Sequence, residues 1–406
     1  MIRRDTEENM EKKQTGYIYW INGLRGIACI MIFLHHFLVG FFPATYYGVG
    51  VVSHGNGAWD VFLSQSPLGV FINGNFWVCV FCVLSALVQS YKIYHSEDLG
   101  ELPYDMAKRY FRLALPVFCV SCIVYLMLKL ETFGNIQAGA VTQSPWIMSY
   151  YQVKASVKDV FLSAFVNVWT QGDTTFSNAF WMLQYILWGS YLTYMLALVT
   201  RNRRPRILVL YLGLIVLFIN RNVYMTAFVA GCFVAYEMTY YSGRFWDSLW
   251  LGVTELVAGL FMGGYPTGVA PSNIYRYLTW MPYERWHILG ALFFVLGIIH
   301  LKPMRQLLET RVSLFLGKIS FAVYLVHIPV VFSLGTYAFL WSYGATGRYQ
   351  ISAGLACVVS VCAILVLAAL FRRFVEPLCG RIISRGMKLV MAPMAVPIEN
   401  DPRENG

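Results

Sequence analysis

The hydrophobic positions along the chain form long, almost uninterrupted apolar stretches. Ten of these stretches approach the roughly 20 residues that a helix needs to cross the hydrocarbon of a bilayer. They lie at 20–42, 69–91, 112–130, 179–200, 205–221, 223–241, 245–264, 285–301, 318–340 and 351–371. Backbone groups in lipid must be hydrogen-bonded within the chain, so each stretch is expected to be a helix. The pattern therefore predicts an all-α polytopic membrane protein with about ten transmembrane helices.

The composition supports this fold class and adds an orientation. The chain is 58% hydrophobic and only 13% charged, whereas a soluble domain carries about 25% charged residues. Ten spans place both termini on one side, and most of the 31 Lys and Arg residues fall in segments on that same side. This asymmetry indicates cytosolic N and C termini. The net charge of +10 is thereby attributed to membrane orientation, and no nucleic-acid partner is expected.

The same pattern divides the chain into three parts. We predict a cytosolic leader at 1–16, a ten-helix transmembrane domain at 17–390, and a disordered cytosolic tail at 391–406. Two Cys-x-x-Cys pairs, at 79–82 and 119–122, have a spacing seen in zinc sites, but both lie in apolar helices without a turn to wrap a metal. No metal is therefore expected.

The first predicted span carries the strongest candidate for chemistry. Ionisable groups within a membrane helix are costly and mark functional sites. Arg25 and His36 are eleven residues apart, which places them on one helix face about 16 Å apart along the axis. His35 is expected to point about 100° away from that face. The pair suits an anion site near the helix entrance with a titratable base deeper in the membrane. A snorkelling Arg and a His bonded to a neighbouring helix are the alternative.

Two further polar sets lie near other span ends. Ser320, Tyr324 and His327 follow the spacing i, i+4, i+7 and share one face of the ninth predicted span. Hydrogen bonds between helices are the alternative explanation for this stripe. Arg109 and Arg112 lie one turn apart at the entrance of the third span. They suit phosphate binding, although the positive-inside pattern alone also explains them.

Together these residues resemble a known family. Leu24-Arg25-Gly26, with ten residues between Arg25 and His36, resembles the Arg-x10-His signature of the acyltransferase-3 family of membrane O-acyltransferases. Other segments resemble further motifs of this family in the same order, over roughly residues 20–377. They are Phe81-Cys82-Val83-Leu84-Ser85-Ala86, Arg109-x-x-Arg112, Gly317-Lys318-Ile319-Ser320 through Tyr324-Leu325-Val326-His327, and Phe374-Val375-Glu376-Pro377.

The resemblance implies a multi-pass enzyme of the plasma membrane. It would move an acyl group, most often acetyl, from cytosolic acyl-CoA to a hydroxyl of a saccharide or another hydroxylated envelope molecule. His36 would be the general base, Arg25 would place the donor, and Tyr324 or His327 would stabilise the oxyanion. The acyl-CoA site would comprise Arg25, Arg109, Arg112, Ser85 and Ser320.

The chain departs from the family pattern at one position. Ile186 stands where the family often has Glu, five residues after Trp181, so a role for that carboxylate is not carried over. Glu255 lies within the seventh predicted span and its partner is not evident from the sequence.

A transporter of a small solute, acyl group or protons, using the buried Arg, His and Glu, is the alternative function. The acceptor, the acyl chain length, a covalent acyl-enzyme and the oligomeric state are left open by these motifs.

Overall fold

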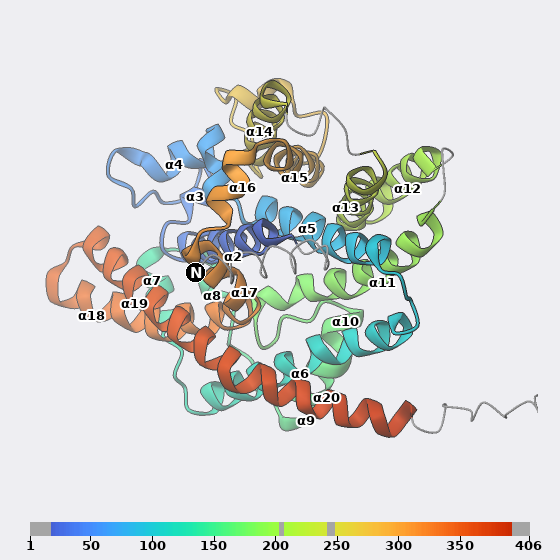
Figure 1. The fold of residues 1–406 in the computed structure, drawn as a ribbon. Coiled ribbons are helices and arrows are strands. Elements are labelled where there is room, and N and C mark those ends of the chain that lie inside the picture. Colours follow the sequence, from blue (N-terminus) through green and yellow to red (C-terminus); the bar gives the residue numbers. More distant parts are fainter. Residues whose placement is uncertain (1–17, 203–206, 242–247, 392–406) are drawn as a thin grey trace, which may run out of the picture.

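The computed structural model describes residues 18–202, 207–241 and 248–391. Within these residues the chain consists of helices and connecting turns, without strands (Figure 1). The all-α prediction is thus confirmed for the described chain. The predicted leader at 1–16, and residues 392–406 of the predicted tail, lie outside the described residues.

The long helices are formed by the apolar stretches and by an amphipathic segment at 376–391. These are α2 (Tyr19–Phe41), α5 (Gly74–His95), α6 (Leu102–Lys129), α11 (Leu183–Thr200), α12 (Ile207–Arg221), α13 (Val223–Tyr240), α14 (Leu249–Gly263), α15 (Tyr283–His300), α17 (Arg311–Val330), α18 (Thr336–Thr346), α19 (Tyr349–Leu370) and α20 (Glu376–Met391). Shorter helices connect them: α3 (Ala44–Tyr47), α4 (Trp59–Ser64), α7 (Asn135–Thr142), α8 (Pro145–Met148), α9 (Val157–Leu162), α10 (Val168–Thr170) and α16 (Lys302–Leu308). Single 3₁₀ or π turns complete the order: η1 (Asn56–Ala58), η2 (Pro67–Ile72), η3 (Ser163–Asn167), η4 (Asn178–Met182), η6 (Ile274–Tyr277), η7 (Val331–Gly335) and η8 (Phe371–Val375).

The described helices include six that are long and apolar enough to cross a membrane. A seventh results if α15 and α16, between which the chain bends by 98°, are counted as one broken span. The six are Tyr19–Phe41, Gly74–His95, Leu102–Lys129, Asn178–Thr200, Arg311–Thr346 and Tyr349–Met387. The predicted spans at 205–221 and 245–264 fall on shorter apolar helices. The number of ten, and the cytosolic position of the termini, stay predictions.

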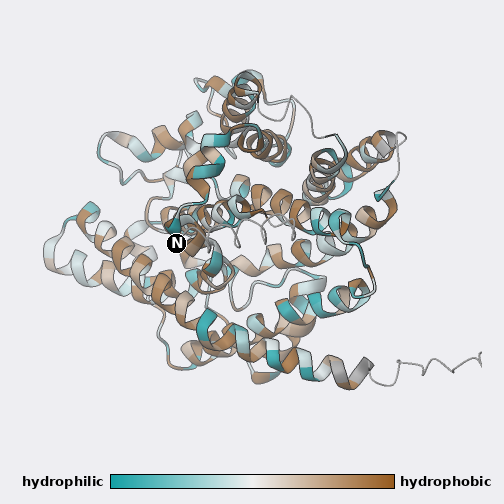
Figure 2. Ribbon diagram, viewed as in Figure 1, coloured by the Kyte–Doolittle hydropathy of each residue, from teal (hydrophilic) through white to brown (hydrophobic). Residues whose placement is uncertain are grey.

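Many large apolar side chains lie on the outer faces of these helices. Figure 2 shows hydrophobic residues along most of the helical ribbon, and the exposed ones include Leu126 of α6, Trp250 of α14 and Val358 of α19. A soluble protein rarely exposes such extended apolar surface, whereas lipid covers it at little cost. The surface therefore supports a multi-pass membrane protein.

Helices α2 and α17 cross very closely near the middle of the molecule. A Cβ added to Gly317 of α17 would lie 2.1 Å from the carbonyl oxygen of Asn22, and one added to Gly26 of α2 would lie 2.4 Å from the nitrogen of Gly317. Small residues allow membrane helices to approach to backbone contact. This crossing sets the rotation of α2 against α17 and thereby the position of their polar faces.

A larger side chain at this crossing is expected to destabilise the fold. Gly317→Val should lower the free energy of unfolding by on the order of 1–3 kcal/mol, because the added carbons overlap backbone atoms of α2. The fraction of monodisperse protein in detergent, followed against temperature, measures this loss. Gly354→Val on α19 is the matched control, since a Cβ there meets nothing within 4 Å. Equal losses in the two variants would contradict the argument.

Candidate active site

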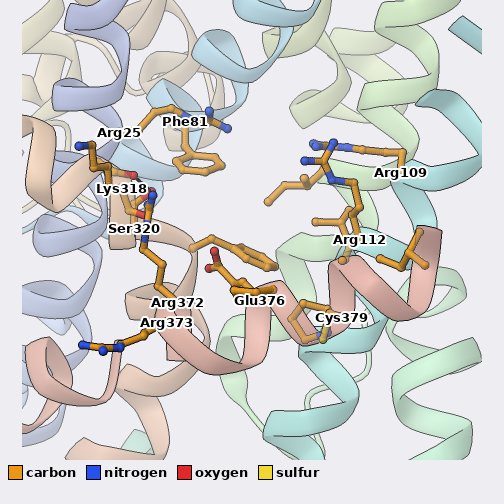
Figure 3. A pocket seen from close by; sticks show the side chains of 18 residues that line it. Arg25, Phe81, Arg109, Arg112, Lys318, Ser320, Arg372, Arg373, Glu376 and Cys379 are labelled. Atoms are coloured by element: carbon orange, nitrogen blue, oxygen red, sulfur yellow. Dashed lines mark hydrogen bonds between the residues drawn. The ribbon is translucent and has the colours of Figure 1, made fainter. Parts of the chain in front are cut away.

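A strongly basic cavity lies where α2, α6, α17 and α20 come together. Its volume is about 770 Å³, and its lining includes six basic side chains and one carboxylate. These are Arg25, Arg109, Arg112, Lys318, Arg372, Arg373 and Glu376. In Figure 3, Arg25, Lys318 and Ser320 form one wall and Arg109 and Arg112 the opposite wall. An excess of positive charge of this size in a partly enclosed space favours an anionic ligand.

Contacts with neighbouring groups hold several of these cations in place. The guanidinium of Arg25 lies 5.0 Å from the ring centroid of Phe81, a cation–π distance. The Nε of Arg109 donates a hydrogen bond to Ser190 Oγ at 3.1 Å. Arg372 donates to the carbonyl oxygen of Lys318, which joins η8 to α17. The positive charges are therefore positioned before any ligand enters.

Most of the residues that were predicted to bind the acyl-CoA donor line this cavity. Arg25, Arg109, Arg112 and Ser320 all line it, whereas Ser85 lines neither of the two cavities described here. Ser85 is 2% exposed on α5, in a segment that packs tightly against α13. A Cβ on Gly231 of α13 would lie 2.3 Å from the carbonyl oxygen of Val83. Ser85 thus lies outside both cavities, in a closely packed part of α5.

A second cavity lies at the other end of α2 and is aromatic. Its volume is about 380 Å³, and no Asp, Glu, Lys or Arg is among its lining residues. Eight of those residues are Tyr or Trp: Tyr46, Tyr47, Trp146, Tyr150, Trp181, Tyr224, Tyr283 and Tyr324. Aromatic walls with phenol hydroxyls at their edges suit a neutral ligand that combines apolar surface with hydroxyl groups.

The two predicted residues of α2 therefore line different cavities. Arg25 lines the basic cavity and His36 the aromatic one, and the two cavities share no lining residue. On α17 the division is the same, since Ser320 lines the first and Tyr324 the second. The face of α2 that was predicted to carry both Arg25 and His36 thus lines two separate cavities.

His36 forms a pair with His327 of α17. The Nε2 of His327 lies 3.0 Å from the Nδ1 of His36, and the Nδ1 of His327 lies 2.8 Å from the carbonyl oxygen of Tyr324. A carbonyl only accepts, so the Nδ1 of His327 carries a proton. In the neutral pair the Nε2 of His327 then accepts from the Nδ1–H of His36. The remaining ring nitrogen of His36, Nε2, is left as a proton acceptor.

The aromatic cavity also includes His35, contrary to the sequence prediction. His35 was expected to point away from the functional face, yet both histidines line the cavity. The Nδ1 of His35 donates to the carbonyl oxygen of Ile72 at 2.8 Å, and its ring lies edge-on to Tyr46 at 5.3 Å. The cavity is wide enough to span two adjacent faces of α2. Spacing along one helix does not reveal this, because the loops that close the cavity come from other parts of the chain.

Hydrogen bonds hold two further residues that line this cavity, Tyr324 and Asn178. The hydroxyl of Tyr324 donates to the carbonyl oxygen of Ala179, so this predicted oxyanion donor is already engaged. The hydroxyl of Tyr150 donates to the Oδ1 of Asn178 at 2.5 Å. Burial raises the pKa of Tyr150 above its usual value, which keeps this phenol protonated as a donor at neutral pH. Because Oδ1 of Asn178 accepts from Tyr150, the other amide atom of this cavity-lining residue is the donor Nδ2.

A hydrogen-bond chain holds two further residues that line the aromatic cavity, Tyr224 and Asn75. The hydroxyl of Tyr224 donates to Asn75 Oδ1 at 2.7 Å, and Asn75 Nδ2 donates to His287 Nδ1 at 2.8 Å. His287 is fully buried and its Nε2 lies 2.8 Å from the carbonyl oxygen of Tyr265. None of these residues carries a family motif, so sequence reasoning missed them. Their only signal was a polar residue placed in an apolar stretch.

The structure also shows where the carboxylates of Glu255 and Glu376 lie. Glu255 of α14 pairs with His300 of α15, with Oε2 and Nδ1 2.5 Å apart, and neither residue lines the two cavities. Ile186, which stands in place of the common Glu, lines the basic cavity together with Glu376. A carboxylate is therefore present in that cavity, but it comes from α20 instead of α11.

Comparisons with known proteins find acyltransferases among the relatives of this chain. Acyltransferase R4 of Phoma sp. is 33% identical over 114 residues, which are 27% of this chain and 24% of that protein. Acyltransferase clz18 of Cochliobolus lunatus is 33% identical over 133 residues, 30% of this chain and 28% of that protein. The chain thus spans about a quarter of the length of these curated relatives, and no solved structure gives a significant match. A family profile described as an acyltransferase domain matches residues 18–372, so the chain belongs to the acyltransferase-3 family.

Proposed function

We propose that this acyltransferase is a multi-pass O-acyltransferase of the plasma membrane that moves an acyl group, acetyl in the simplest case, from acyl-CoA to a hydroxyl of a neutral acceptor. Saccharides are the first acceptors to test. One observation carries the proposal: His36 is held by His327 with its Nε2 as a proton acceptor, in a cavity that lacks charged side chains. The basic cavity at the other end of the same helix supplies the matching site for an anionic donor.

The donor is proposed to bind with its phosphates in the basic cavity. Arg25, Arg109 and Arg112 line opposite walls there, and arginine matches phosphate oxygens with two donors at once. Coenzyme A joins such a charged head to a long thin arm that ends in the thioester. The arm would pass between α2 and α17, beside Tyr324, to bring the thioester to His36.

The chemistry assigned to His36 is general base catalysis. The acceptor hydroxyl gives its proton to His36 Nε2 as its oxygen forms a bond with the thioester carbonyl carbon. The carbon–sulfur bond then breaks, and the released CoA thiolate takes the proton from His36. His327 accepts from the Nδ1–H of His36 throughout and stabilises the imidazolium. It is thus proposed as a positioning residue, in place of the oxyanion role that the motif implied.

The oxyanion that forms on the thioester carbonyl needs a hydrogen-bond donor in the aromatic cavity. Tyr324 is bonded to Ala179, whereas Asn178 presents its Nδ2 because Tyr150 occupies its Oδ1. We assign Asn178 to this position. A donor oriented in advance stabilises the developing charge without reorganisation at the moment of reaction.

The acceptor is proposed to be neutral because the aromatic cavity offers no countercharge. A carboxylate or phosphate would be desolvated there without a cationic partner among the lining residues. An uncharged sugar or another hydroxylated molecule with apolar faces packs on the aromatic rings without this cost.

A transporter is not favoured by the described structure. The relay suggested by the sequence would need Arg25, His36 and Glu255 within hydrogen-bonding reach of one another. Arg25 and His36 line separate cavities, and Glu255 is paired with His300 away from both.

Transfer of a labelled acyl group tests the proposed function. The full chain, purified in detergent, is given acetyl-CoA labelled in the acetyl group together with neutral saccharides, uronic acids and hydroxylated apolar molecules. We expect label in a neutral acceptor and an equal amount of free CoA thiol. Label that stays on acetyl-CoA, or that moves across a proteoliposome membrane without thiol release, would contradict the proposal.

Replacing His327 tests its positioning role. His327→Leu removes the acceptor for His36 Nδ1–H, and losing one hydrogen bond to a group that becomes charged costs about 1.5–3 kcal/mol. Transfer should therefore slow by roughly 10–100-fold. His327→Gln, whose side-chain oxygen still accepts, is expected to recover much of the rate. Steady-state acetyl transfer measures both variants, and equal rates for the two would show that the side chain only fills space.

A further inference from the structure

A second basic groove lies beside the proposed donor cavity, between α6 and α20. Its volume is about 420 Å³, and it is lined by Lys108 and Arg112 of α6 and by Arg381 and Arg385 of α20. Each pair is spaced four residues apart, so both side chains of a pair face the groove from the same side of their helix. No carboxylate is among the lining residues of this groove.

The groove is continuous with the basic cavity. Arg112, Pro377, Gly380 and Ile383 line both spaces, which places Arg112 at their junction. Together the two spaces form one basic region with two clusters of positive charge. One cluster surrounds Arg25, Arg109 and Arg372, and the other surrounds Arg381 and Arg385.

The packing of α20 explains why its arginines face this groove. Cys379, Ile383 and Met387 are buried on one side of α20, at 4%, 4% and 7% exposure, and α20 runs along α6 (Figure 1). Arg381 and Arg385 are exposed beside this buried stripe. An amphipathic helix that seats its apolar side in this way leaves its cations at the rim of the groove.

We propose that the groove between α6 and α20 binds the 3′-phosphate of coenzyme A while the adjoining basic cavity binds its diphosphate. Coenzyme A carries these two phosphate groups on opposite sides of one ribose, which corresponds to two basic clusters joined at Arg112. The inference rests on the proposed acyl-CoA donor and adds that the enzyme selects its donor by the 3′-phosphate. The phosphate of an anionic lipid headgroup has related chemistry, and the experiment separates the two sources.

The test compares two ligands that differ only in this phosphate. Calorimetry with the detergent-purified full chain measures the affinity for CoA and for 3′-dephospho-CoA. Wild type is expected to bind CoA at least about tenfold more tightly, a value typical for a charge-assisted contact. Arg381→Gln/Arg385→Gln should lower the affinity for CoA to that for 3′-dephospho-CoA and leave the latter unchanged. Arg348→Gln, an exposed arginine before α19, is the matched control and should leave both affinities unchanged.

Each other outcome overturns a specific part of the inference. Equal affinity of wild type for the two ligands would overturn the groove proposal and leave the proposed function standing. Binding of neither ligand would overturn the proposed donor itself. If the double variant retains its preference for CoA but loses binding to vesicles containing phosphatidylglycerol, the groove is a lipid site and the 3′-phosphate proposal fails.

Discussion

Replacing His36 by glutamine is expected to lower the rate of acyl transfer by roughly 10²–10⁴-fold, the contribution typical of a positioned general base. Glutamine has a similar size and keeps a hydrogen bond to His327, but it does not take up a proton from the acceptor hydroxyl. The loss should appear in kcat, because the donor phosphates are proposed to bind in the other cavity, which shares no lining residue with that of His36. Single-turnover transfer of labelled acetyl from acetyl-CoA measures the chemical step.

A matched control separates this effect from a general loss of structure. His95→Gln changes an exposed histidine that stacks on Tyr91 at the end of α5, outside both cavities. It should retain the wild-type rate. Binding of CoA by His36→Gln should remain within about twofold of wild type, which shows that the variant is folded. A rate near wild type for His36→Gln would remove the proposed base and with it the catalytic proposal.

Replacing Asn178 by alanine is expected to lower kcat by roughly 10²–10³-fold, the usual loss when one oxyanion donor is removed. The reason is that Tyr150 donates to Asn178 Oδ1, which leaves Nδ2 as the amide donor that we propose for the oxyanion. The Michaelis constant for acetyl-CoA should change little, because the interaction forms as charge develops on the carbonyl oxygen. Steady-state kinetics, with the acceptor that the labelled-transfer assay identifies, measure both constants.

Two further variants sharpen the assignment of Asn178. Asn220→Ala, an exposed asparagine at the end of α12, is the control and should leave kcat unchanged. Tyr150→Phe keeps Asn178 but removes the hydrogen bond to its Oδ1, so a smaller loss in kcat is expected. A raised Michaelis constant with unchanged kcat in Asn178→Ala would show that Asn178 binds the ground state and does not stabilise the oxyanion.

Much of the candidate site was predictable from short-range sequence patterns. Arg25 and His36 stand out because ionisable groups interrupt an apolar stretch, and Arg109 and Arg112 because they lie together where another stretch begins. Such signals survive folding, since a charge that cannot enter lipid has to face protein or a cavity. The number of spans was less predictable: helices such as α14 are apolar but short, and apolar composition alone does not distinguish a span from a buried helix.

The sequence by itself determined that this chain is helical and apolar-surfaced, that it belongs to its family, and that its first long helix carries an arginine and a histidine three turns apart. These properties follow from local composition and spacing. Only the tertiary structure decided that the two residues line separate cavities, that His327 orients His36, and that Tyr150 orients Asn178. Those relations join groups far apart in the chain, and they depend on backbone contacts such as Gly26 against Gly317, which no periodicity within one helix encodes.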